Sequence, residues 1–174
     1  MGISRTERPG FRVEPLHARH DRAAFCCGIP ELDSYLQRQA RQDVERDLAV
    51  VFVLTPDGET VAGFYTLSAH SIQAADLPEN VAKKLPKFPL PVTLLGRMAV
   101  SNTRHRQGLG EFLLMHALER AWIASEQVAS WAVVVDAKAG AREFYLRYDF
   151  LPLPSNPNRL FLPMRTIQLL FAHR

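Results

Sequence analysis

The chain has 174 residues, of which 47% are hydrophobic and 22% are charged. This composition excludes an intrinsically disordered chain. The length fits one compact domain with a sizeable core, so we expect a single domain over residues 1–174. The net charge of +3 is compatible with an anionic coenzyme or with nucleic acid and requires neither.

Two further features limit the class of protein. No apolar run approaches the roughly 20 residues that a membrane helix needs. The arginine-rich segment Met1–Arg22 lacks the apolar stretch of a signal peptide, so we expect a cytoplasmic protein with no membrane partner. Cys26 and Cys27 are adjacent, which suits neither a disulfide framework nor spaced metal ligands, and we expect no metal site.

The first half of the chain predicts a strand, a helix and a hairpin. Apolar residues at helical spacing indicate the helix, and Pro56–Gly58 supplies the turn of the hairpin. The expected elements are a strand at Phe11–Pro15, a helix from Ile29 to about Arg46, strands at Ala49–Leu54 and Thr60–Ser68, and a short helix and loop within Leu77–Pro91.

The second half alternates strands with helices. The expected elements are a strand at Val92–Val100, a polar loop at Ser101–Gln107, a helix from the following glycines to about Ser125, a strand at Trp131–Ala137, a helix at Gly140–Tyr148, a turn and short strand from Asp149–Pro152, and a final strand at Leu160–Ile167. A hairpin followed by strand–helix units and closing strands predicts an α/β (α+β) fold, with a mixed sheet and helices on its faces.

The polar loop ahead of the longest predicted helix carries the clearest chemistry. Gly108 and Gly110 stand at the start of this helix, whose free N–H groups and partial positive charge favour a phosphate. Glycines let the backbone approach an anion closely, and Arg104 and Arg106 add charged donors. We therefore expect the N–H groups between His105 and Gly110 to bind a pyrophosphate.

Two other phosphate-binding motifs are excluded. A P-loop needs Gly-Lys-Ser/Thr, whereas Gly110 is followed by Glu111. A dinucleotide fingerprint needs a third glycine where this chain has Leu113. Taken alone, the two glycines are equally compatible with a plain turn between a strand and a helix.

In its context, this strand–loop–helix unit resembles the central motif of the GNAT superfamily of N-acetyltransferases. The match is His105–Gly110 (HRQGLG), where the family has Arg/Gln-x-x-Gly-x-Gly/Ala, and His105 departs from the first position. The resemblance implies a mixed, mostly antiparallel sheet flanked by helices, with an acetyl-CoA cleft at the central strands. It also implies the residues that contact acetyl-CoA: Met98, Ala99 and Val100 near the acetyl-pantetheine end, and Arg104, His105, Arg106, Gln107, Gly108, Leu109 and Gly110 at the pyrophosphate.

The resemblance extends to the acetyltransferase toxins of bacterial toxin–antitoxin modules. The segments that carry it are Phe25–Gly28 with Leu32–Leu36, Gly63–Ser71, Leu94–Val100, Val134–Ala137 with Phe144–Phe150, and Leu160–Ile167. Such toxins acetylate the α-amino group of aminoacyl-tRNA and thereby block translation. The resemblance thus implies acetyl-CoA as co-substrate, aminoacyl-tRNA as substrate, a ribbon-helix-helix antitoxin as partner and a homodimer.

The resemblance places a general acid at Tyr145. A phenol with an ordinary pKa of about 10 is protonated at neutral pH and can donate to the coenzyme sulfur, although a tyrosine that only packs is the alternative. Tyr148 is expected to be a packing residue. An α-amine with an ordinary pKa of about 7.7–8.0 is already partly neutral, so no general base is assigned among the available carboxylates Glu111, Asp136 and Glu143.

Basic residues elsewhere are candidates for binding the acceptor. Arg97 lies in the middle of a strand, where a guanidinium must face a cleft or form a salt bridge. Lys83 and Lys84 are assigned to substrate binding, although solvated faces are the alternative. The full basic set that could bind tRNA phosphates is Lys83, Lys84, Lys87, Arg38, Arg41 and Arg46. His70 and His116 lack metal-ligand spacing and are expected to pack.

Two alternatives to a tRNA-acetylating toxin stay open. The glycine loop fits equally well a GNAT enzyme that acetylates a small-molecule amine or a protein amine. A non-catalytic module that binds acyl-CoA or a partner protein could also use the same fold, because a fold alone does not fix function.

Overall fold

The computed structural model describes residues 8–137 and 140–172. Within these residues, seven strands form a sheet with the order β1-β2-β3-β4-β5-β7-β6. The β4–β5 pair is parallel, and the registered pairs β1–β2, β2–β3, β5–β7 and β6–β7 are antiparallel. The described chain divides into two compact units, residues 8–68 with 96–117 and residues 69–95 with 118–172. This mixed, mostly antiparallel sheet confirms the predicted fold class.

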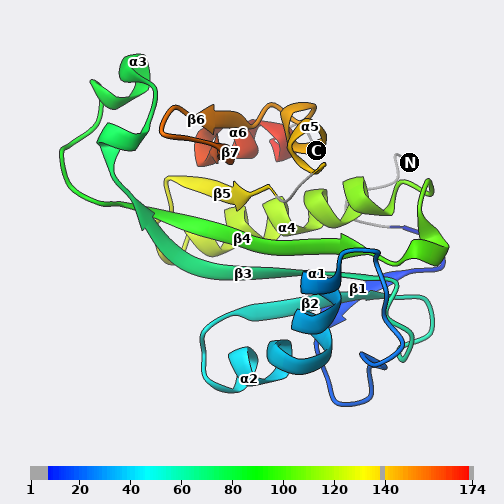
Figure 1. The fold of residues 1–174 in the computed structure, drawn as a ribbon. Helices are drawn as coiled ribbons and strands as arrows, with labels where there is room; N and C mark the ends of the chain where they lie inside the picture. Colours follow the sequence, from blue (N-terminus) through cyan, green and yellow to red (C-terminus); the bar gives the residue numbers. More distant parts are fainter. Residues whose placement is uncertain (1–7, 138–139, 173–174) are drawn as a thin grey trace. The chain divides into compact units, whose positions relative to one another are not determined.

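The first unit is an antiparallel ladder covered by helical turns (Figure 1). Its elements are β1 (Arg12–Pro15), α1 (Pro30–Ser34), η1 (Tyr35–Gln39), α2 (Ala40–Glu45), β2 (Val50–Thr55), the start of β3 (Gly63–Ile72), the end of β4 (Leu90–Val100), η3 (Asn102–Arg104) and the start of α4 (Leu109–Ser125). The predicted helix from Ile29 to about Arg46 is helical from Pro30 to Glu45. Within it, η1 is a π-turn closed by the Ala40 N–H on the Tyr35 carbonyl.

Aromatic and aliphatic side chains form the core of this unit. Leu36, Val53 and Phe64 are fully buried between the helical turns and the ladder. Phe25 meets Phe64 edge-on at 5.5 Å, and Tyr35 stacks on Phe64 at 6.2 Å. Burying each such side chain stabilises the fold by about 2–3 kcal/mol, which fixes the helical turns on β2 and β3.

The second unit contains the remaining strands and helices. Its elements are the end of β3, η2 (Ala74–Asp76), α3 (Glu79–Ala82), the start of β4, the end of α4, β5 (Ala132–Asp136), α5 (Arg142–Leu146), β6 (Leu151–Leu153), β7 (Asn156–Pro163) and α6 (Met164–Phe171). β5 is paired on both edges, and Val133, Val134 and Val135 are buried. This explains why the segment is apolar throughout instead of alternating.

The predicted final strand Leu160–Ile167 is wrong in its second half. β7 ends at Pro163, and Met164–Phe171 form helix α6. Pro163 is the N-cap, with an extended backbone that directs the chain out of the strand, and its missing N–H cannot continue a ladder. Met164, Ile167 and Phe171 are the buried residues of α6, and the polar residues Arg165, Thr166 and Gln168 lie between them, which is a helical spacing.

Two other predictions need correction. β3 continues to Ile72 instead of ending at Ser68. The sequence also favours a single apolar face on α4 that includes Arg120, but the successive residues Phe112–Met115 are all buried, whereas Arg120 is exposed. None of the helices in residues 8–137 and 140–172 combines the length and apolar character needed to cross a bilayer.

Candidate active site

The loop between β4 and α4 has an unusual backbone. Arg106 and Gly108 both adopt left-handed conformations, with φ of +65° and +72°. For Gly108 this costs little, but for Arg106 it costs about 1–2 kcal/mol. Strain of this kind persists where the surrounding structure enforces it and is concentrated at functional sites. This backbone makes the turn a candidate functional site.

The start of α4 faces this loop with its backbone N–H groups. At the start of α4, the Phe112 N–H donates to the Gly108 carbonyl of the loop at 3.1 Å. The preceding N–H groups of the first turn lie ahead of that bond and are available to an anion. Leu109 is 1% exposed between Gly108 and the half-buried Gly110, so the core of the first unit anchors the start of the helix.

Side chains of the loop surround these donors. Arg104 is half-buried, with its guanidinium carbon 5.4 Å from the centre of the Phe11 ring. His105 Nε2 lies 3.0 Å from the Val100 carbonyl; because a carbonyl only accepts, this ring nitrogen carries the hydrogen. Arg106 and Gln107 are exposed. His105 thus closes the loop onto β4, and the arginines supply positive charge.

Sequence reasoning missed Arg8. Its guanidinium donates to the Gln107 carbonyl, and its Nη1 would lie 3.3 Å from a side chain built at Gly108. The carbonyl and the next N–H of a trans peptide point in opposite directions, so this contact directs the Gly108 N–H away from Arg8. The partners are 99 residues apart, and no local pattern in the sequence could have indicated the contact.

The end of β4 contributes a different environment. Ala99 is buried, and Met98 and Val100 are half-buried. A side chain at Gly63 would lie only 2.9 Å from the Ala99 carbonyl and 2.8 Å from Leu113. Gly63 is therefore needed for the close approach of β3, β4 and α4 beside the loop.

Arg97 takes part in a cation–π stack. Its guanidinium carbon lies 3.7 Å from the centre of the Tyr35 ring, and its backbone N–H donates to Thr66 Oγ1 at 3.1 Å. Tyr35 in turn donates its hydroxyl hydrogen to the buried Asp43 at 2.8 Å. Burial and this hydrogen bond raise the pKa of Tyr35 above its ordinary value. Arg97 is thus held by an aromatic face, a partner that the sequence did not indicate.

Tyr145 belongs to the second unit and lies on α5. It is 6% exposed, and its ring meets Phe144 at 5.2 Å and Phe150 at 5.5 Å, both edge-on. Burial raises the pKa of Tyr145 above its ordinary value, so the phenol keeps its proton at neutral pH. Tyr148 packs on Phe144 at 5.1 Å, which agrees with its expected packing role.

The other candidates mostly have structural partners. Asp136 binds Arg159 through two hydrogen bonds, of 2.7 and 3.0 Å, and His70 Nε2 lies 3.3 Å from the same guanidinium. His116 Nδ1 lies 2.7 Å from the Tyr65 hydroxyl. Glu111 and Glu143 are exposed. No group of three potential metal-binding side chains occurs in residues 8–137 and 140–172.

The basic residues fall into the two units. Lys83, Lys84 and Lys87 are exposed in the second unit, whereas Arg38, Arg41 and Arg46 are exposed in the first. Arg41 pairs with Glu45 at 3.1 Å. The assignment of Lys83 and Lys84 to substrate binding stays a prediction.

The mixed sheet, with a strand that leads through a glycine-containing loop into the longest helix, indicates the class of protein. A model of the acetyltransferase (GNAT) family matches residues 16–150, and the chain belongs to that family.

Among curated proteins, the chain is similar to bacterial toxins. It is 36% identical to the probable toxin TacT of Sinorhizobium fredii over 171 residues, covering 92% of this chain and 94% of that protein. It is also 36% identical to the tRNA-acetylating toxin of Mycobacterium tuberculosis over 153 residues, covering 87% and 91%.

Solved structures agree with this family placement. A Tyr→Phe mutant of KacT superimposes with a TM-score of 0.87 and 29% identity, covering 92% of this chain and 99% of that chain. AtaT complexed with acetyl-methionyl-tRNAfMet superimposes with a TM-score of 0.85 and 31% identity, with the same coverages. AtaTR bound with acetyl-CoA gives a TM-score of 0.82 at 32% identity, covering 92% and 98%.

Proposed function

We propose that this protein is an acetyl-CoA-dependent N-acetyltransferase that acetylates the α-amino group of aminoacyl-tRNA, and that it acts as a toxin by blocking translation. The observation that carries the proposal is 36% identity to a tRNA-acetylating toxin over 87% of the chain. The solved relative AtaT holds acetyl-methionyl-tRNAfMet, which is the product expected of such a reaction.

The loop ahead of α4 fits the pyrophosphate of acetyl-CoA. The left-handed Arg106 and Gly108 bend the backbone just ahead of α4, and the α4 N-terminus adds partial positive charge. Arg104 and Arg106 supply charge-assisted hydrogen bonds. The full set that we assign to the coenzyme is Met98, Ala99, Val100, Arg104, His105, Arg106, Gln107, Gly108, Leu109 and Gly110. Acetyl-CoA, when bound there, supplies the acetyl group as a thioester.

Tyr145 is the proposed general acid. Its buried phenol, with a pKa raised by burial, is present only in the protonated form at neutral pH and can donate to the departing sulfur. The packing of its ring against Phe144 and Phe150 restricts the direction in which the hydroxyl points. In this role Tyr145 donates the hydrogen of a hydroxyl group held in one direction, and its phenol does not have to ionise before the reaction.

The acceptor amine needs no dedicated base. An α-amine with an ordinary pKa of about 7.7–8.0 is partly neutral at physiological pH, and the ester link to tRNA withdraws electrons and increases that fraction. We assign Arg97, held flat on Tyr35, to the acceptor end of the substrate, together with Lys83 and Lys84 for the phosphates of tRNA. No carboxylate is assigned to proton removal.

We also propose a ribbon-helix-helix antitoxin as partner and a homodimer as the assembly. In support, AtaT has been solved with the C-terminus of its antitoxin AtaR, and KacTA has been solved with DNA. An upstream reading frame that encodes a ribbon-helix-helix protein would support the pairing, and sedimentation of the purified protein would test the dimer.

The decisive experiment measures transfer of labelled acetyl from acetyl-CoA to charged total tRNA. Uncharged tRNA, free polyamines and a lysine peptide are the parallel acceptors. We expect label only in charged tRNA, released by mild base as an N-acetyl amino acid. Label in the polyamine or the peptide would leave an acetyltransferase of another specificity. No transfer to any acceptor, despite coenzyme binding, would favour a binding module.

A further inference from the structure

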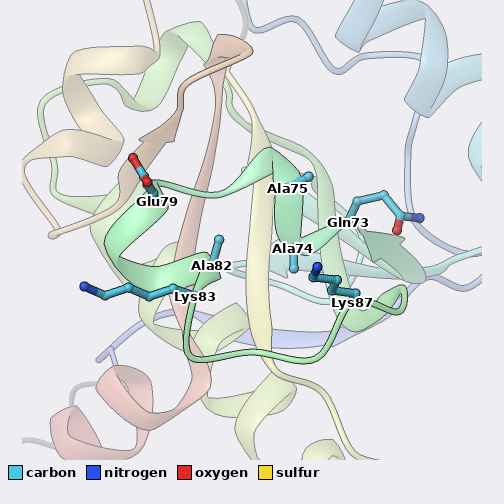
Figure 2. A pocket seen from close by; sticks show the side chains of 7 residues that line it. All are labelled: Gln73, Ala74, Ala75, Glu79, Ala82, Lys83 and Lys87. Carbon is cyan, nitrogen blue, oxygen red and sulfur yellow. The ribbon is translucent and has the colours of Figure 1, made fainter.

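A pocket lies beside α3 in the second unit. It has a volume of about 370 Å³ and is lined by Gln73, Ala74, Ala75, Glu79, Ala82, Lys83 and Lys87. Figure 2 shows the three alanines between the polar side chains, with Glu79 and Lys83 on one side and Gln73 and Lys87 on the other. The floor is therefore apolar and the rim is polar and mainly basic, and an apolar lining with a few polar groups is typical of a ligand pocket.

The charge on this rim is positive. Lys83, Lys84 and Lys87 are all exposed within a short segment between α3 and β4, and Glu79 is the acidic residue of the lining. A ligand that carries phosphate groups is therefore favoured over a neutral or cationic ligand. The amide of Gln73 offers both a donor and an acceptor to the edge of a ligand seated on the alanines.

An exposed aromatic ring follows this rim directly. Phe88 is 68% exposed, next to Lys87 in the chain. An aromatic ring that stays exposed to water does not stabilise the fold through burial. An exposed ring beside lysines is, however, the combination that binds unpaired nucleotides. Bases stack on aromatic side chains while cationic groups contact the phosphates.

We propose that this pocket and Phe88 bind unpaired nucleotides of the tRNA substrate. One base stacks on Phe88, a neighbouring base covers the alanine floor beside Gln73, and Lys83, Lys84 and Lys87 contact the linking phosphates. This inference rests on the proposed function, because it takes tRNA to be the substrate. It assigns to Lys83 and Lys84 a specific role in the binding of single-stranded RNA.

The test compares single-stranded with double-stranded RNA. Fluorescence anisotropy with the full-length protein measures binding of a short labelled RNA, alone and annealed to its complement. We expect Phe88→Ala to weaken binding of the single strand by about tenfold and to leave duplex binding unchanged, because the faces of paired bases are covered. Phe88→Tyr keeps an aromatic face and should keep the affinity. Val128→Ala, at a 78% exposed position, is the matched control.

The lysines are tested through salt dependence. Replacing Lys83, Lys84 and Lys87 by Gln should reduce the slope of log affinity against log salt by about 2, since each phosphate contact on a single strand contributes about 0.7. Arg165→Gln, at an exposed residue of α6, should leave the slope unchanged. Equal binding of duplex and single strand, with no effect of Phe88→Ala, would overturn the proposal. Displacement of RNA by an acidic peptide at equal concentration would do the same.

Acetyl transfer measured in parallel separates this inference from the function on which it rests. We expect Phe88→Ala and the lysine variants to raise KM for charged tRNA by about tenfold with little change in kcat. Unchanged KM in variants of an active enzyme refutes the RNA pocket and leaves the function standing. Absence of transfer by the unsubstituted protein refutes the function, while RNA binding that depends on Phe88 would then define an RNA-binding module.

Discussion

Removal of the Tyr145 hydroxyl is the most direct test of the chemistry. Tyr145→Phe leaves the ring in place, and its edge-on contacts at 5.2 Å with Phe144 and at 5.5 Å with Phe150 need only the ring. We therefore expect the free energy of unfolding to change by no more than about 1 kcal/mol. A general acid accelerates a reaction by about 10²–10⁴-fold, which corresponds to about 3–5 kcal/mol of lost transition-state stabilisation.

The assay combines turnover with coenzyme binding. Acetyl transfer to charged tRNA should fall by about 10²–10⁴-fold in Tyr145→Phe, whereas calorimetry should give unchanged affinity for acetyl-CoA. Tyr148→Phe makes the same chemical change three residues away, at a half-buried ring that packs on Phe144, and should leave turnover within about twofold. Equal turnover of Tyr145→Phe and the unsubstituted protein would refute the role of Tyr145 as the acid.

Further predictions concern the coenzyme loop and the acid stability of the fold. Gly108→Asp should abolish acetyl-CoA binding in calorimetry. Gly108→Asn tolerates the same left-handed backbone without a charge and should bind acetyl-CoA within about tenfold of normal. Equal affinities of these two variants for acetyl-CoA would refute the anion site. Arg8→Ala removes the donor to the Gln107 carbonyl and should weaken acetyl-CoA binding by about tenfold with an unchanged melting temperature. A normal affinity of this variant for acetyl-CoA would show that the loop keeps its shape without Arg8. Partial burial raises the pKa of Glu14, but hydrogen bonds from His20, Arg12 and Arg19 outweigh it and lower that pKa to about 2. Because the folded value lies below the ordinary 4.5, Glu14 stabilises the fold above about pH 4.5 and this contribution is lost as the pH falls toward 2; Glu14→Gln should flatten the stability profile in that window, and an unaltered profile would contradict the assignment.

The position of the loop ahead of α4 could be predicted because its signals are local. Glycines at a helix start and a strand before them are adjacent in sequence, and Gly108 is left-handed and Leu109 buried in the structure. The left-handed backbone of Arg106 could not be predicted, because residues other than glycine seldom adopt it. This backbone conformation depends on the surrounding fold, and no residue type in the loop indicates it.

Features that join distant segments were beyond sequence reasoning. The contact of Arg8 with Gln107 and the stack of Arg97 on Tyr35 each need two segments to be placed in space first. The predicted final strand Leu160–Ile167 runs past Pro163 because Met164 and Ile167 are apolar like Leu160–Leu162. The change from a strand to a helix at Pro163 is marked only by a shift to helical spacing.

The contact of Arg8 with the coenzyme loop has a practical consequence for handling the protein. Arg8 lies near the start of the chain, and the loop whose backbone it orients begins 93 residues after it, at Ser101 (101 − 8 = 93). A shortened version of the protein that begins after Arg8 would lack the guanidinium that donates to the Gln107 carbonyl. We expect such a preparation to melt normally and to bind acetyl-CoA weakly, so its low activity would reflect the missing arginine.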